Sequence, residues 1–321
     1  MRKKLTVVCI TSLSYTGTTW INTVLGCHEN AFALGPSNRI IDLLGKNSSK
    51  DACRVHPGNC QFWDEFLKIY DKNKNFYIQL ADFSGKNFII INNPIPNTNA
   101  FTDFKHKNIE LKKINIVRDG RAVCSSAMKH IKDKDYLEIL TEWFAPSAAN
   151  LFWDKECPDV LCIRYEDTMK EKISFIKKAG AFIGLDYPEN AYEFWKFDHH
   201  LAAGNSGLIG QIRAFHSKEK GELKESGDFL PAYDTPNETW KEKLSPSQLF
   251  LFEYYCGKIN QGWGYEPSKF TIEEFKEFSG LVDLNLAESI ENRHSAAKDP
   301  KKPSQFKKKM KQLFLNTFKA R

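Results

Sequence analysis

The stretch that decides the fold runs from Ser12 to Gly26 and reads Ser-Leu-Ser-Tyr-Thr-Gly-Thr-Thr-Trp-Ile-Asn-Thr-Val-Leu-Gly. It follows a β-branched apolar run, Leu5–Ile10, which is typical of a buried parallel strand. After Gly17 the apolar residues keep helical spacing up to Gly26, where we expect the helix to end. Strand, tight loop and helix in this order turn free N–H groups and the positive helix end into one concavity. The stretch therefore predicts a site for a phosphate-like anion.

The same loop does not have the residues of a nucleotide-triphosphatase loop, which needs a second Gly followed by Lys and then Ser or Thr. Here Gly17 is followed by Thr18-Thr19-Trp20, and the chain contains no Gly-Lys-Ser or Gly-Lys-Thr. A hydroxyl-rich loop of this kind also has a purely structural interpretation, as a cap for the helix that follows.

A second anion-binding signal lies at the end of a predicted buried strand, Ile114–Val117. Arg118 follows this strand at the carboxyl edge, where open α/β sheets bind ligands, and Ser126 lies eight residues further on in the next helix. A planar guanidinium together with a hydroxyl suits a phosphate monoester. A structural Arg–Asp pair that ties the strand end to the helix is the alternative interpretation.

Two later segments complete the pattern. Tyr165 comes directly after a predicted strand, Val160–Arg164, and opens a predicted helix. Further on, Gly204-Asn205 precedes two more glycines and Arg213, and we expect a mobile loop there. Because Gly-Asn is also a common turn, this last segment carries little weight alone.

Together these motifs resemble those of the PAPS-dependent sulfotransferases, in their bacterial and tyrosylprotein branch, where PAPS is phosphoadenosine phosphosulfate. The resemblance spans about residues 5–265 and implies a three-layer, P-loop-type α/β fold with a central parallel sheet. It implies transfer of a sulfuryl group from PAPS to an acceptor hydroxyl or amine, with adenosine 3′,5′-bisphosphate as product and no metal. The cofactor-binding residues that it implies are Tyr15, Thr16, Gly17, Thr18, Thr19, Trp20, Arg118, Ser126, Tyr165, Gly204, Asn205 and Arg213.

Two departures from the family pattern affect the catalytic residues. Tyr15 stands where cytosolic members place a Lys, and Gly35-Pro36 stands where tyrosylprotein enzymes place Gly-Glu with its base. We expect Tyr15 to hydrogen-bond the leaving group, and Lys86 or Arg39 to supply positive charge. Asp82 is our first candidate for the base, because the strand predicted over residues 76–80 brings it to the ligand edge. The other candidate bases are His28, His56 and His130.

Two other functions remain open from the sequence: a P-loop nucleotide kinase or other phosphotransferase, and a non-catalytic nucleotide-binding module. The missing loop Lys and the Arg118/Ser126 pair weigh against the kinase. The sequence does not identify the acceptor, which we expect to be a small molecule, lipid, glycan or peptide.

The net charge of +6 is unevenly placed. Residues 301–321 hold eight Lys and Arg and no acid, so the rest of the chain sums to about −2 (38 basic minus 40 acidic residues). The body is therefore not expected to bind nucleic acid. We expect residues 266–321 to form a helical, basic extension of the domain at 1–265. Its last, amphipathic helix suits an anionic membrane or acidic partner, and equally packing on its own domain or on a second copy of the chain.

The eight cysteines include no Cys-x-x-Cys pair, which favours a reduced, cytoplasmic location. Cys53 and Cys60 flank His56 in one short segment that could clip a loop or hold a metal. Two thiols and one imidazole fall short of a four-ligand structural site, so we expect neither.

Overall fold

The structure is a computed structural model and describes residues 4–46, 49, 52–58, 60–94, 106–145, 147–148, 160–216, 238–288 and 290. The chain divides into two compact units, the first comprising Met1–Arg118 and Cys157–Pro236, the second Asp119–Glu156 and Asn237–Arg321. This division differs from the predicted domain over residues 1–265. The reason is that the helix after Arg118 packs with helices near the other end of the chain.

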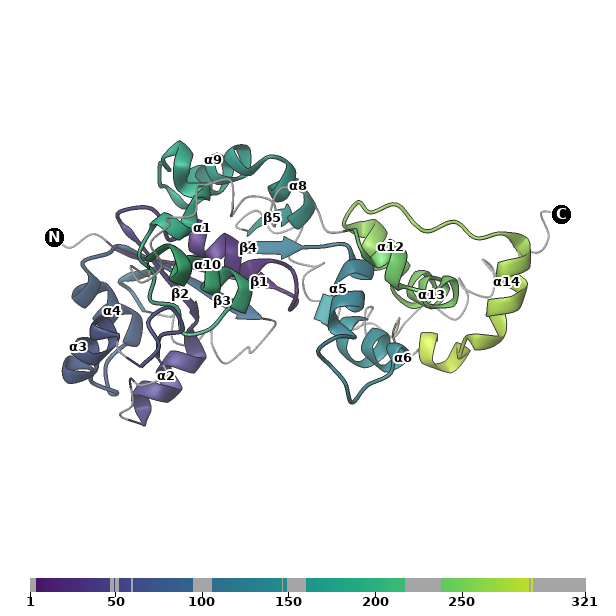
Figure 1. Ribbon diagram of the computed structural model, residues 1–321, viewed down its shortest axis with the longest axis horizontal. Helices are drawn as coiled ribbons and strands as arrows, with labels where there is room; N and C mark the ends of the chain where they lie inside the picture. The colour runs from purple at the N-terminus through teal and green to yellow at the C-terminus, as the bar shows by residue number, and fades with distance from the viewer. Residues whose placement is uncertain are drawn as a thin grey trace. The chain divides into compact units, whose positions relative to one another are not determined.

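The first unit is built on a parallel sheet of five strands in the order β2-β3-β1-β4-β5 (Figure 1). The central strand is fully buried along its whole length, as its apolar sequence predicts. The sheet confirms the predicted α/β class with a central parallel sheet. The strands are β1 (Leu5–Ser12), β2 (Ala31–Pro36), β3 (Phe88–Pro94), β4 (Ile109–Val117) and β5 (Val160–Arg164).

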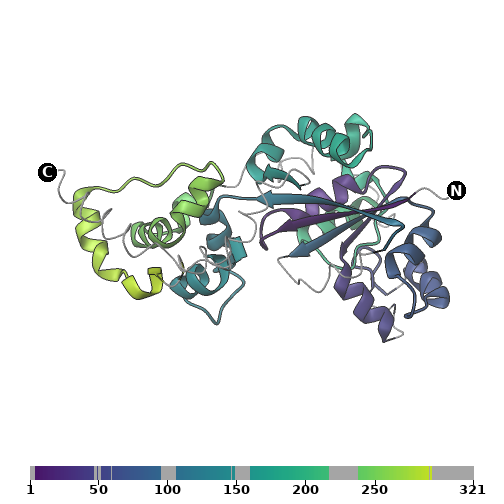
Figure 2. The ribbon, with the colours of Figure 1, turned by 180° about the vertical axis from the view of Figure 1, so that it is seen from behind.

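Helices cover both faces of this sheet (Figures 1 and 2). One helix leads from β1 out to β2, and three helices lead back from β2 to β3. Because crossovers in parallel sheets are right-handed, the two sets lie on opposite faces. The first set is α1 (Thr18–Leu25), against which α9 (Lys172–Ile183) packs, and the second is α2 (Ser37–Gly45), α3 (Gln61–Ile69) and α4 (Phe76–Ser84). The core lies between these helices and the buried strands.

The strand predicted over residues 76–80 is wrong, because this segment is the helix α4. Its apolar run has no clear period, and the ends decide its structure. The Asn75 side chain accepts a hydrogen bond from the N–H of Ile78 at 3.1 Å, and Gly85 ends the helix in the left-handed conformation. Asp82 therefore lies in the last turn of a helix and does not end a strand.

The expected glycine-rich loop after Asn205 is also a helix, α10 (Ser206–His216). The Asn205 side chain accepts a hydrogen bond from the N–H of Leu208 at 3.0 Å. Leu208, Ile209 and Ile212 are buried. This apolar face outweighs the modest cost of two glycines in the helix interior.

In the second unit, the described residues form helices around a buried polar centre. They are α5 (Gly120–Ala127), α6 (Tyr136–Glu138), the π-helix η2 (Ile139–Phe144), α12 (Trp240–Lys243), α13 (Pro246–Gly262), α14 (Ile272–Phe278) and the 3-10 helix η6 (Ser279–Leu281). The predicted amphipathic helix at the end of the chain lies outside the described residues.

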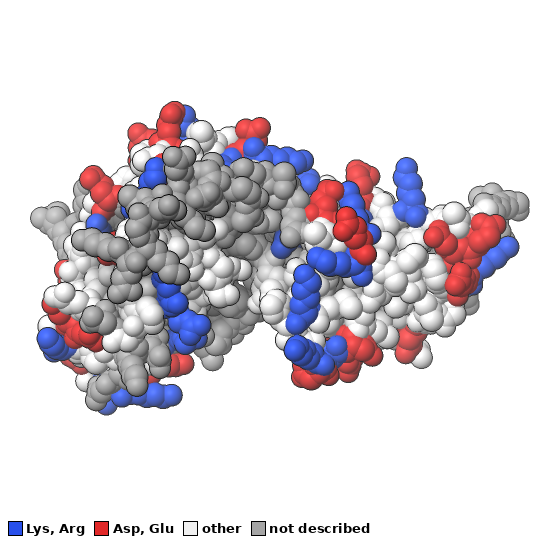
Figure 3. Space-filling model, in the orientation of Figure 1, with Lys and Arg blue, Asp and Glu red and all other residues white. Residues whose placement is uncertain are grey.

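Charged side chains of both signs are interspersed on the visible face of each unit (Figure 3). Within the described part of the chain, none of the helices has the length and apolar character that a bilayer span requires.

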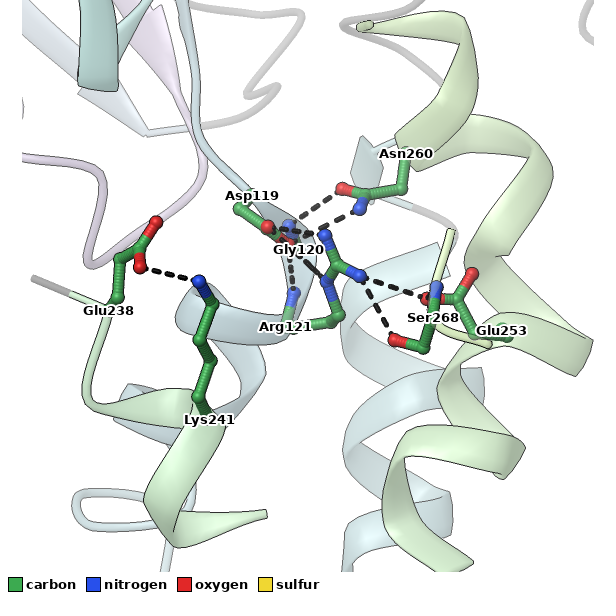
Figure 4. Close-up of polar contacts among 8 residues, drawn as sticks. All are labelled: Asp119, Gly120, Arg121, Glu238, Lys241, Glu253, Asn260 and Ser268. Carbon is green, nitrogen blue, oxygen red and sulfur yellow. Dashed lines mark hydrogen bonds and ion pairs between the residues drawn. The ribbon is translucent and has the colours of Figure 1, made fainter. Parts of the chain in front are cut away.

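Arg121 organises the polar centre of the second unit (Figure 4). Its Nη2 donates to Asp119 at 2.7 Å and its Nη1 donates to Glu253 at 3.2 Å. The guanidinium also lies 4.3 Å from the ring centroid of Trp240. Asn260 closes the network, donating to Asp119 and accepting from the N–H of Gly120. The predicted structural Arg–Asp pair thus exists, but its cation is Arg121.

Replacing Arg121 by Ala should lower the free energy of unfolding by about 3–5 kcal/mol, because two buried carboxylates lose their cation. Urea unfolding followed by circular dichroism measures the change. The matched control is Lys241→Ala, whose ammonium lies 2.5 Å from Glu238 but whose side chain is 55% exposed. An exposed pair of this kind contributes less than about 1 kcal/mol. Equal losses in the two variants would contradict this account.

Candidate nucleotide site

The loop between β1 and α1 forms the base of the candidate site. Gly17 caps α1 in the left-handed conformation at φ 79°, without a side-chain cap, and the first turn of α1 has no acidic residue. The first N–H groups of any helix have no carbonyl partner within it, and they carry the positive end of the helix dipole. The Thr16 hydroxyl donates to the carbonyl of Leu13 at 2.7 Å and so holds the loop closed. The order of strand, tight loop and helix that the sequence predicts is therefore present.

Arg118 reaches this loop from the neighbouring strand. β1 and β4 are parallel and adjacent, and Ser12 pairs with Ile116, so both strands end at the same edge. Nη1 of Arg118 donates to the backbone carbonyl of Tyr15 at 2.6 Å. Among the described residues, Tyr15 is the one non-glycine with positive φ, at 67°, a conformation that costs about 1–2 kcal/mol. The Arg118 contact holds the carbonyl of this strained residue.

Tyr165 supports both parts of the site from a third strand. It opens α8 (Tyr165–Lys170) directly after β5. Its ring lies under the Arg118 guanidinium, with 4.9 Å from the guanidinium carbon to the ring centroid. The ring also packs so closely on Gly17 that a Cβ there would overlap it. Burial raises the pKa of the Tyr165 hydroxyl, so the phenol is neutral at neutral pH.

The Gly204-Asn205 segment meets the start of α1. The N–H of Asn205 donates to the Thr19 hydroxyl at 3.0 Å. A Cβ on Gly204 would lie 2.6 Å from the methyl carbon of Thr19, so glycine permits this approach. Sequence reasoning missed Thr19 as the contact point of this segment, although the hydroxyl-rich loop and the Gly-Asn pair both signalled a close approach.

The remaining predicted cofactor residues are placed differently. Trp20 is 3% exposed, and its ring packs on that of Phe175 of α9 with the ring centroids 5.7 Å apart. Trp20 is therefore a core residue. Nη2 of Arg213 donates to the backbone carbonyl of Arg54. Ser126 lies in α5 and so belongs to the second unit, and its pairing with Arg118 stays a prediction.

The placement of Lys86 and Asp82 does not support their predicted catalytic roles. Both precede β3, and Phe88 at its start pairs with Thr6 of β1, near the amino end of that strand. The loop between β1 and α1 follows the carboxyl end of the same strand. Nζ of Lys86 donates to the carbonyl of Glu29 at 2.5 Å. Asp82 was predicted as the base because it would end a strand, and this reason no longer holds because the segment is the helix α4.

The residues that do converge give the edge a positive character. Gly17 at the start of α1 and the Arg118 guanidinium both lie against the neutral Tyr165 ring. Tyr15 adds a second phenol, whose pKa is raised by burial. Such a site can hold an anionic group through backbone N–H and guanidinium donors together.

Comparison with solved structures finds proteins of the class that the motifs predict. The sulfotransferase domain of the Synechococcus PCC 7002 olefin synthase aligns at 12% identity and TM-score 0.44, over 88% of this chain and 97% of that one. Mouse sulfotransferase SULT7A1 complexed with PAP aligns at 13% identity and TM-score 0.42, over 91% and 89%. Retinol dehydratase in a complex with retinol and PAP aligns at 15% identity and TM-score 0.40, over 84% of each chain.

No family model and no curated protein sequence matches the chain. Because the identities are low and these TM-scores lie below 0.5, we derive the function from the residues of the site.

Replacing Gly17 by Ala should abolish anion binding and lower stability, because the new Cβ meets the Tyr165 ring and positive φ disfavours alanine. The matched control is Gly184→Ala, at φ 87° with nothing within 4 Å of the new Cβ. The control should lose about 1–2 kcal/mol of stability and keep its nucleotide affinity. Thermal unfolding and calorimetric titration with adenosine 3′,5′-bisphosphate measure both. Unchanged affinity in a folded Gly17→Ala variant would refute the assignment.

Proposed function

We propose that this protein is a PAPS-dependent sulfotransferase that transfers a sulfuryl group to an acceptor hydroxyl or amine. The observation that carries the proposal is the contact of the Arg118 guanidinium with the loop that begins α1. It supports one site with two places for negative groups, as a doubly phosphorylated nucleotide requires.

The proposed roles follow from the positions of the residues. The backbone N–H groups of residues 16–19 hold the 5′-phosphosulfate at the helix N-terminus. Arg118 binds the 3′-phosphate with the N–H groups that do not contact Tyr15. Tyr165 lies beside the adenine, and the Gly204-Asn205 segment covers the loop at Thr19.

The proposed reaction is an in-line displacement at sulfur. A bond forms between the acceptor oxygen or nitrogen and sulfur as the bond from sulfur to the bridging phosphate oxygen breaks. The acceptor releases its proton to solvent water, and adenosine 3′,5′-bisphosphate leaves with the bond's electron pair. As in phosphoryl transfer, positioning and charge stabilisation supply most of the catalysis. Loop N–H groups and the neutral Tyr15 phenol donate hydrogen bonds to the bridging oxygen as its charge develops.

Calorimetric titration with adenosine 3′,5′-bisphosphate and, separately, with ATP and Mg²⁺ tests the donor assignment. We expect micromolar binding of the bisphosphate and much weaker binding of ATP. The reverse order would favour a nucleotide kinase. Turnover of PAPS labelled in its sulfuryl group, screened against small alcohols, lipids, glycans, amines and peptides, then tests catalysis. Bisphosphate binding without transfer to any acceptor would favour a binding module.

Replacing Arg118 by Ala should weaken binding of the bisphosphate by about 10- to 100-fold, because a charge-assisted contact contributes about 1.5–3 kcal/mol. The affinity of Arg118→Lys for the bisphosphate should lie between those of wild type and Arg118→Ala, since lysine keeps the charge and loses the planar guanidinium. The control is Lys177→Ala on α9, which removes one positive charge from a side chain that is 62% exposed. Circular dichroism checks the fold of each variant. Equal affinities for wild type and Arg118→Ala would contradict the proposal.

A further inference from the structure

Four potential metal ligands of the first unit gather beside the sheet, outside the phosphate loop. Cys53, His56 and Cys60 lie in the segment between α2 and α3, and His200 lies far along the chain, shortly before Gly204. Their four ligand atoms all lie within 4.8 Å of one another. The sequence segment alone offered two thiols and one imidazole. The fold adds the fourth ligand that a structural site requires.

The distances within this cluster suit a single tetrahedral ion. Nδ1 of His56 lies 3.5 Å from Sγ of Cys53 and 4.0 Å from Sγ of Cys60, and Nδ1 of His200 lies 3.4 Å from Sγ of Cys60. Bond lengths of about 2.0–2.3 Å in a tetrahedron separate the ligand atoms by about 3.3–3.8 Å. The four ligands lie too close together to surround several metal ions.

Asp198 orients both imidazoles. Its Oδ1 lies 3.4 Å from Nε2 of His56, and its Oδ2 lies 3.5 Å from Nε2 of His200. Both histidines therefore turn Nδ1 to the thiols and Nε2 to one carboxylate. This is the outer arrangement that holds metal-ligating histidines in the required tautomer.

The surroundings fix His200 further. Its ring stacks on Phe62, with centroids 4.4 Å apart and planes at 11°, and its carbonyl accepts from Nε1 of Trp63 at 3.0 Å. Cys53 and Cys60 are 3% and 5% exposed, so the thiols are shielded from solvent. The ligands are thus held in place by packing that is independent of any ion.

We propose that Cys53, His56, Cys60 and His200 bind one structural Zn²⁺ ion. Mixed thiolate and imidazole ligands in a compact tetrahedron select zinc among the common divalent metals. Binding displaces the two thiol protons into solvent, so that the ion is held by two thiolates and two neutral imidazoles.

The ion ties two distant segments together. The N–H of Arg54 donates to the carbonyl of Leu201 at 2.7 Å, next to two of the ligands. A few residues later, the N–H of Asn205 contacts the Thr19 hydroxyl at the start of α1. The zinc site therefore anchors the segment that leads onto the start of α1.

Metal analysis of the purified full-length chain tests this proposal. Inductively coupled plasma mass spectrometry should find about one zinc per chain after reconstitution with Zn²⁺ under reducing conditions. Co²⁺ substitution should give the intense visible bands of a tetrahedral site and thiolate charge-transfer absorption. Cys60→Ser and His200→Ala should lose the metal, whereas the control Cys162→Ser, a half-buried cysteine outside the cluster, should keep it.

A second variant, which leaves all four ligands in place, tests the proposal if the ligand variants do not fold. Asp198→Asn changes a side chain that is 62% exposed and is not a ligand. Competition with a chromophoric chelator should show a zinc affinity 10- to 100-fold lower than that of wild type, about the loss known for outer partners. Three results would overturn the proposal: no zinc in the reconstituted wild type, a Cys53–Cys60 disulfide that persists under reducing conditions, or undiminished zinc affinity in Asp198→Asn.

Discussion

The hydrogen bond from Arg118 to the carbonyl of Tyr15 is the contact on which the candidate site depends. It joins the ends of two adjacent parallel strands, and it holds a tyrosine in a backbone conformation that tyrosine rarely adopts. Such strain persists where the surrounding structure determines the conformation, and it concentrates at functional sites. The Tyr165 ring, which lies under the Arg118 guanidinium and against Gly17, completes the support. Loop, cation and ring therefore form one rigid unit at the ligand edge of the sheet.

Two arginines stand close together in the run Arg118-Asp119-Gly120-Arg121, and they make different contacts. The first arginine turns to the loop between β1 and α1, where it donates to the carbonyl of Tyr15. The second is buried between Asp119 and Glu253, where it neutralises two carboxylates in the interior of the helical unit. From sequence, Arg118 has two interpretations, a ligand contact or a structural ion pair. The structure places the ion pair on Arg121, and the ligand contact of Arg118 stays a prediction.

Much of the fold follows from the sequence, because the buried strands and the strand–loop–helix stretch carry strong local signals. Residues at the ends of parallel strands were predictable for the same reason, as Arg118 and Tyr165 illustrate. The prediction for Asp82 is wrong because its apolar run has no clear period, and the Asn75 cap and Gly85 make the segment a helix. His200 lies 140 residues from Cys60, and only the tertiary structure brings their side chains together.

A crystal structure of the protein with adenosine 3′,5′-bisphosphate tests the central claim most directly. The account predicts that the 5′-phosphate accepts hydrogen bonds of about 2.7–3.2 Å from the backbone N–H groups at the start of α1. It also predicts that the 3′-phosphate contacts the Arg118 guanidinium while the bond to Tyr15 persists. A nucleotide bound elsewhere, or bound here with its 3′-phosphate away from Arg118, would contradict the account.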